Sequence, residues 1–125
     1  MKIRTVVGST LAVTALAVTP SAAHASAPAQ TQPYQHLVTG KSWSSGGTYV
    51  STGGDVTLNL TTLEKNTRVF VEQCEGSDLG DVQTFTKKAP SHTLATGLEK
   101  GTCFLILFAP QSGNGGYLVK GTLSY

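Results

Sequence analysis

Apolar and polar residues alternate over several short stretches of the chain, and this alternation predicts β-strands. It is clearest over residues 55–61, where Val56, Leu58 and Leu60 share one face and threonine and asparagine side chains share the other. Weaker alternation and β-branched content predict the other strands in the same way. Their expected ranges are 48–52, 67–74, 82–86, 91–96, 102–109 and 116–125.

Turn-forming residues separate these stretches and indicate the fold class. Glycine, asparagine, aspartate and serine gather between the expected strands, and from residue 41 onward no stretch keeps a 3.6-residue period. Without helices to bridge parallel neighbours, such strands are expected to pair antiparallel. The sequence therefore predicts an all-β fold, a small antiparallel β-sandwich of six to seven strands.

A short motif occurs twice, as TTLEKNTR at residues 61–68 and as TGLEKGTC at residues 96–103. In each copy a leucine, Leu63 or Leu98, is expected to close the core at the end of a strand. The Glu-Lys pair is then expected to form an exposed turn before the next strand. We interpret the motif as one structural device used twice, with no binding site in it.

The first 40 residues differ in composition from the rest. Lys2 and Arg4, an uncharged stretch and the Ala-His-Ala pattern at 23–25 predict a secretory signal peptide over residues 1–25. Residues 26–40 contain two prolines, three glutamines and no charge, which predicts a flexible N-terminal arm. We therefore expect a secreted protein with its β-sandwich domain at residues 41–125.

The two cysteines, Cys74 and Cys103, are expected to form a disulfide, because an exported chain meets oxidising conditions. Cys74 ends one expected strand and Cys103 lies near the start of another. If these strands are antiparallel neighbours, Glu72 lies opposite Leu105 and Phe70 lies opposite Leu107. A bridge between the two sheets stays open as the alternative, because spacing alone does not fix the geometry.

The charge balance argues against nucleic acid and membranes as partners. Removing Lys2 and Arg4 from nine basic residues leaves seven, which equals the number of acidic residues. A neutral domain lacks the clustered basic residues that bind phosphates or anionic lipids.

Candidate catalytic and metal-binding groups are few. No catalytic motif surrounds His36 or His92, and Ser91 beside His92 would point to the opposite face of a strand. We therefore expect no catalytic residues, no metal and no cofactor. Three carboxylates share one loop but match no compact calcium loop. They are Glu75, Asp78 and Asp81.

One expected strand is apolar on both faces. In the run from Cys103 to Ala109, either Phe104, Ile106 and Phe108 or else the leucines between them would meet water in a two-layer sandwich. Such a run needs a cover, supplied either by the arm or a loop of the same chain or by a partner chain. We expect Leu105→Asp to prevent folding.

Two segments carry resemblances to known families. LEKGTCFLIL followed by SGNGGYLV is similar to the final hairpin of bacterial pre-peptidase C-terminal-like sandwiches, although the acidic strand motif of that family is absent. In size, order of parts and cysteine count, the chain resembles the small secreted adaptor subunit of actinobacterial umbrella toxin particles.

The second resemblance implies a non-enzymatic assembly subunit in an antibacterial toxin complex. The arm would enter a cleft on a lectin-like subunit, with Tyr34, His36 and Leu37 as anchors. The sandwich would accept a strand from a toxin repeat. The residues expected there are Phe104, Ile106 and Phe108.

Two other functions remain open. A secreted carbohydrate-binding or adhesion domain would use surface aromatic residues as a sugar platform. The candidates are Trp43, Tyr49, Tyr117 and Tyr125. A secreted enzyme inhibitor would instead use the arm as a substrate-like strand.

Overall fold

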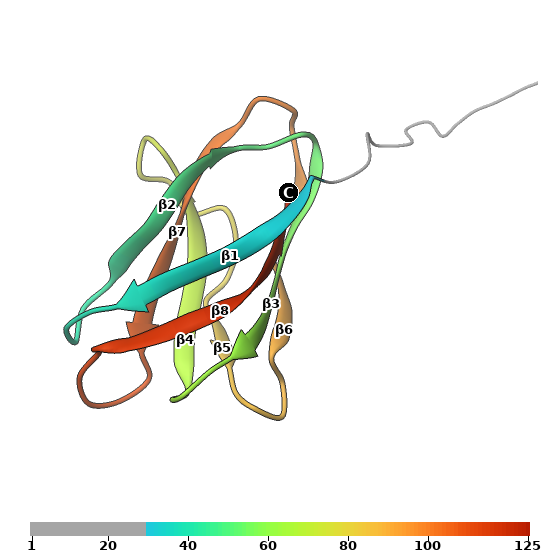
Figure 1. Cartoon of the computed structure of the whole chain (residues 1–125). Coiled ribbons are helices and arrows are strands. Elements are labelled where there is room, and N and C mark those ends of the chain that lie inside the picture. The colour runs from blue at the N-terminus through green and yellow to red at the C-terminus, as the bar shows by residue number, and fades with distance from the viewer. Residues whose placement is uncertain (1–29) are drawn as a thin grey trace, which may run out of the picture.

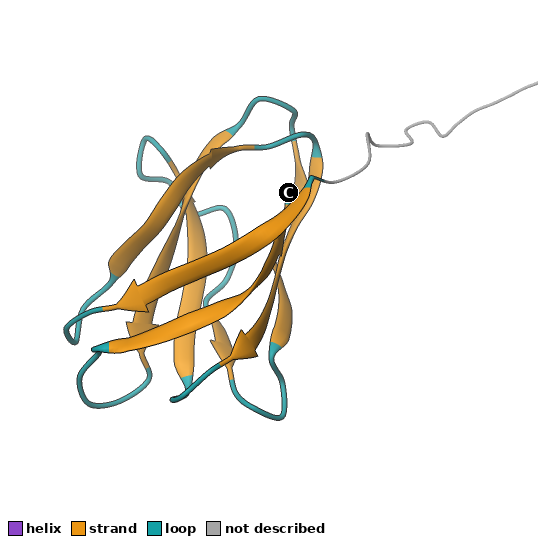
Figure 2. Ribbon diagram, viewed as in Figure 1, coloured by secondary structure: helices purple, strands orange, loops and turns teal. Residues whose placement is uncertain are grey.

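The structure, a computed structural model, describes residues 30–125 as eight antiparallel strands in two sheets (Figure 1). No helix occurs in this range, and loops connect all the strands (Figure 2). The strands are β1 (Thr31–Val38), β2 (Ser44–Val50), β3 (Gly54–Thr62), β4 (Thr67–Gln73), β5 (Gln83–Phe85), β6 (Ser91–Leu98), β7 (Cys103–Pro110) and β8 (Tyr117–Ser124). The predicted all-β sandwich is confirmed.

The two sheets have the strand orders β1-β8-β3-β6 and β2-β7-β4-β5. Only the connection from β4 to β5 joins neighbours within one sheet, and every other connection crosses from one sheet to the other. Most residues of each strand therefore contribute alternately to a shared core and to an outer face.

Both copies of the repeated motif lie where the chain passes from the first sheet to the second, between β3 and β4 and between β6 and β7. A threonine hydroxyl closes each turn: Thr67 Oγ1 donates to the Lys65 carbonyl oxygen at 2.9 Å, and Thr102 Oγ1 donates to that of Glu99 at 2.7 Å. Both copies thus form a crossover turn, although the two threonine hydroxyls bond to non-equivalent positions, two and three residues earlier in the chain.

The core lies between the sheets and contains the inward side chains of both. As predicted, Val56, Leu58 and Leu60 of β3 share the buried face. From β7, the buried residues are Phe104, Ile106 and Phe108, each with no exposed surface. Burial of an aliphatic or aromatic side chain contributes about 1.5 to 3 kcal/mol, so these strands account for much of the stability.

The predicted flexible arm is wrong over most of its length. Residues 31–38 form β1, which pairs with β8 in an unbroken register from Thr31 opposite Ser124 to Val38 opposite Tyr117. The β-sandwich therefore begins at Thr31 and not at residue 41. Pro33 is compatible with this strand because β1 is at the edge of its sheet, where one missing N–H donor is tolerated. The predicted signal peptide and residues 26–29 lie outside the described residues.

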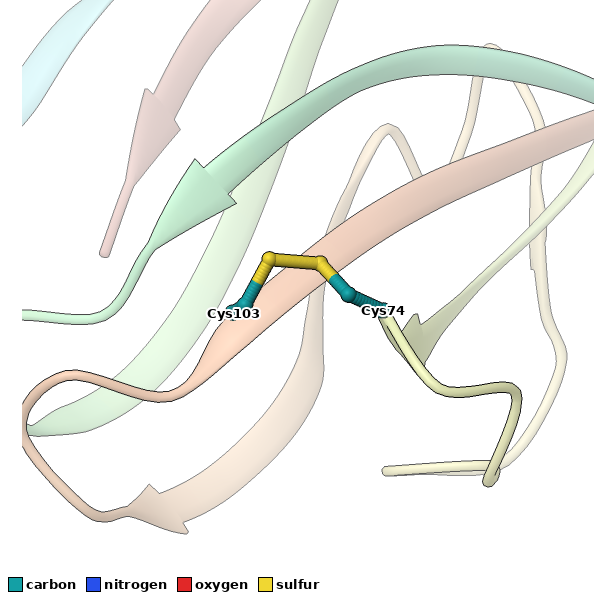
Figure 3. The surroundings of a disulfide bond; sticks show 2 residues. All are labelled: Cys74 and Cys103. Atoms are coloured by element: carbon teal, nitrogen blue, oxygen red, sulfur yellow. A yellow bond between two sulfur atoms is a disulfide. The ribbon is translucent and has the colours of Figure 1, made fainter.

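Cys74 and Cys103 form the predicted disulfide, with their Cα atoms 5.4 Å apart (Figure 3). Cys103 begins β7 and Cys74 directly follows β4, the neighbouring antiparallel strand. The register places Glu72 opposite Leu105 and Phe70 opposite Leu107, as predicted. The bridge is therefore cross-strand and does not join the two sheets.

Candidate protein-binding face

The predicted partner contacts on β7 are wrong. Phe104, Ile106 and Phe108 have no exposed surface and form part of the core, so none of them can contact another chain. The reason lies in the register, because the charged Glu72 is opposite Leu105 and both side chains lie on the outer face. The alternate residues of β7 must then point inward.

Two of the three predicted arm anchors are held inside the sandwich. Tyr34 is 6% exposed, and its hydroxyl donates a hydrogen bond to the Gly46 carbonyl oxygen at 2.6 Å. A Cβ atom at position 46 would collide with the Tyr34 hydroxyl and the Phe108 ring, so only glycine fits there. Leu37 is 52% exposed on the outer face of β1 and remains available to a partner.

His36, the third predicted anchor, bridges the edges of the two sheets. Its Nε2 lies 3.1 Å from Ser44 Oγ, and the Ser44 hydroxyl donates to the Phe108 carbonyl oxygen at 3.3 Å. His36 Nε2 is therefore the donor to Ser44. The imidazole also packs on the Phe108 ring, with centroids 4.7 Å apart. Burial lowers the pKa of His36 below its ordinary value of 6.5, because the charged imidazolium loses hydration.

Acidification is expected to destabilise the sandwich through His36. Because its pKa is lower in the folded chain, the unfolded chain binds the proton more readily, so stability falls as pH drops through about 6.5. Urea denaturation at about pH 8 and pH 5 measures this loss. His36→Gln, which cannot titrate, is expected to show a smaller loss. An equal pH dependence in both proteins would rule out His36 as the cause.

Several apolar side chains gather on the outer face of the second sheet, and we call this surface the Trp43 face. Its apolar members are Val50 at 57% exposure and Trp43 at 37%, together with the half-buried Phe70, Leu105 and Leu107. Arg68 and Glu72 of β4 lie on the same face, on either side of Phe70.

Trp43 lies across this face from the start of β2 to β4. Its indole meets the Phe70 ring edge-on, with centroids 4.7 Å apart, and the Arg68 guanidinium carbon lies 4.9 Å from the indole centroid. Ala109 of β7 is fully buried although its alternation points it outward, which fits an indole lying over it. A small residue at this position lets the tryptophan reach β4. Trp43 of the same chain thus supplies part of the cover that the apolar strand β7 was expected to need.

The two charged side chains on the Trp43 face have no ion-pair partners within residues 30–125. Neither Arg68 nor Glu72 makes an ion pair in this part of the chain, and Arg68 Nε is shielded from solvent without a hydrogen-bond acceptor. Tryptophan and arginine are enriched among the residues that dominate protein interfaces, and the centre of such interfaces is apolar. This face therefore has the chemistry of a protein contact.

The predicted sugar platform is not assembled. Tyr117 and Tyr125 are 4% and 8% exposed, so their rings belong to the core. Tyr49 packs between the Phe104 and Tyr125 rings, at 5.8 and 5.2 Å. Trp43 lies on the outer face of the second sheet, apart from these rings. These four aromatic residues share no surface on which a sugar could stack.

The remaining candidate groups do not form a reactive site. Ser91 is exposed, whereas His92 packs edge-on against Phe85 at 4.5 Å and bonds to the Ala89 carbonyl oxygen at 3.0 Å. Within the described range, no three histidine, cysteine or acidic side chains gather as a metal site would require. The three loop carboxylates, Glu75, Asp78 and Asp81, therefore do not form such a group.

Comparison of the chain with protein-family models, with curated proteins and with solved structures found no match. Residues 30–125 include no helix of the length and apolarity that a membrane span requires. The Trp43 face is therefore the feature on which a functional assignment can rest.

Proposed function

We propose that this chain is a secreted, non-enzymatic subunit that binds other protein chains and holds them in an assembly. The observation that carries the proposal is the Trp43 face, where an exposed indole, a stacked guanidinium and two leucines share one side of a sheet. A contiguous apolar surface of this kind is costly in water and is typical of a surface that a partner covers.

The disulfide supports the secreted part of the proposal. A cross-strand bridge between Cys74 and Cys103 persists in oxidising compartments and is rare in reducing ones. The small domain also benefits from it, because a chain of this size has a limited core.

A more specific role is that of an adaptor that joins lectin-like subunits to a toxin polypeptide. In this role the residues that bind each partner would differ from those expected from the sequence. Residues 30–38 cannot act as a free arm, because β1 belongs to the first sheet and Gln30 is held by two backbone hydrogen bonds to Tyr125. A toxin strand would be added at a sheet edge, where backbone groups are unpaired. β1 suits this role because it is an edge strand of eight residues with a regular register and carries Leu37 outward, although Pro33 removes one N–H donor from the strand.

Purification of the native protein from culture supernatant tests the proposal. We expect wild-type protein to elute in a complex larger than one chain, and Leu107→Glu to elute as a folded monomer, because the charge falls in the centre of the Trp43 face. Lys120→Glu, an exposed change on the first sheet, serves as the control and is expected to behave as wild type. A wild-type chain that elutes alone as a monomer contradicts the proposal.

A further inference from the structure

The Trp43 face is arranged in rows that cross the second sheet. The central row runs through Ser45, Leu107 and Phe70, which lie opposite one another on β2, β7 and β4. On one side of it lies the row containing Ala109 and Arg68, where the Arg68 guanidinium stacks on the Trp43 indole. On the other side lies the row formed by Thr48, Leu105 and Glu72, which a β-bridge extends to Asp78.

This arrangement is complementary to itself. Consider a two-fold axis that lies in the plane of contact along the central row, so that β4 of one copy faces β4 of the other in the antiparallel direction. The Leu107 and Phe70 side chains then meet their own counterparts. The two outer rows exchange, so Arg68 of each copy faces Glu72 of the other.

We infer that the Trp43 face binds a second copy of this chain, in a two-fold symmetric dimer closed by Arg68–Glu72 pairs between the copies. This inference rests on the proposed function, because it names the chain that the Trp43 face binds. Phe70 lies midway between the two charges, about 7 Å along the strand from each, so both pairs form at the same time. Neither charge has an ion-pair partner within residues 30–125 that would compete.

The apolar groups also find suitable positions in this dimer. Trp43 of one copy comes to lie over the row of Thr48 and Leu105 of the other, where the aliphatic side chain offers an apolar surface. Arg68 keeps its stacking on Trp43 while its outer nitrogen atoms meet the carboxylate. Sheet faces that pack in this way lie about 10 Å apart, which interdigitated leucine and aromatic side chains can fill.

The size of the face sets the expected affinity. At about 4.8 Å between strands and about 3.3 Å per residue, the seven or eight residues of β2, β7 and β4 and the three of β5 give a face of roughly 400 Å². Two such faces bury roughly 800 Å², which is below the about 1,000 Å² of a stable specific interface and typical of a weak one. We therefore expect weak, reversible dimerisation, at about tens to hundreds of micromolar.

Charge reversal tests the symmetric pairing. In sedimentation velocity, Arg68→Glu and Glu72→Arg are each expected to weaken self-association at least about tenfold, because like charges then face each other. A mixture of the two variants is expected to dimerise about as well as wild type, because every facing pair is again opposite in charge. The doubly exchanged Arg68→Glu/Glu72→Arg chain is expected to recover in the same way. Lys120→Glu is the matched control and leaves association unchanged.

Three outcomes would overturn the dimer. They are a wild-type chain that stays monomeric up to about 0.5 mM, single variants that associate like wild type, and a mixture that fails to recover. Circular dichroism of each variant shows whether it is folded, and recovery in the mixture cannot arise from misfolded chains. If wild-type protein is monomeric by itself but elutes from supernatant with a different chain that Leu107→Glu loses, the proposed function stands and the dimer does not.

Discussion

Ile106→Ala is expected to lower the free energy of unfolding by about 2 to 5 kcal/mol, whereas Leu105→Ala, one residue earlier, is expected to lower it by about 1 kcal/mol. Ile106 has no exposed surface and lies opposite Val71, which is also fully buried, so truncation leaves a cavity in the core. Leu105 is half-buried on the outer face, opposite Glu72, where water can fill the space. Urea denaturation at a protein concentration that keeps the chain monomeric measures both values.

Aspartate at the same positions gives a larger contrast. Ile106→Asp buries a carboxylate without a partner and is expected to prevent folding, whereas Leu105→Asp is expected to fold. This reverses the sequence-based expectation for Leu105. Because adjacent strand residues point to opposite faces, a comparison of the two variants shows which residues of β7 face the core. Greater damage from Leu105→Asp than from Ile106→Asp would mean that β7 is shifted by one residue from the register in the structure.

The sequence predicts seven of the eight strands because their pattern comes from local chemistry. In β3, inward Val56, Leu58 and Leu60 alternate with small polar residues, and this period belongs to a half-buried strand. The pairing of β4 with β7 is also predictable, because a cross-strand disulfide aligns every residue that follows it. In both cases the information lies in a few neighbouring residues.

β1 escapes prediction because its inward face is only half apolar. Tyr34 and Val38 are buried, but the residue between them on that face is His36, whose polarity is accommodated by Ser44 in the other sheet. Pro33 adds a turn signal that an edge strand tolerates. Buried and exposed side chains do alternate along β1, but the prolines and glutamines of this segment favour an extended chain outside the sheet.

The choice of the buried face of β7 was predictable from the sequence, whereas the Trp43 face was not. Once Glu72 is aligned with Leu105, the cost of burying a carboxylate indicates that Leu105 points outward. The contacts of Trp43 with Arg68 and Phe70 instead join residues more than 20 positions apart. They depend on which strands become neighbours, and no local pattern carries that information.

Removal of the disulfide is expected to lower the free energy of unfolding by about 3 to 4 kcal/mol. The bridge joins residues 29 positions apart, so it restricts the unfolded chain by closing a loop of that length. The folded contacts around it are expected to survive in Cys74→Ala/Cys103→Ala, because the Cys74 amide donates to the Cys103 carbonyl oxygen at 3.0 Å through backbone atoms alone.

This effect on the unfolded state can be separated from a loss of native packing. Without the cross-link the unfolded chain is less compact, so the denaturant slope m is expected to rise while the midpoint falls. Wild-type protein under reducing conditions is the matched control and is expected to match the double variant in both quantities. A loss below about 1 kcal/mol, or an unchanged slope m, would show that the bridge does little to restrict the unfolded chain. Because a domain of this size is stable by only about 5 to 15 kcal/mol, a loss of the expected size would leave the reduced chain partly unfolded at elevated temperature.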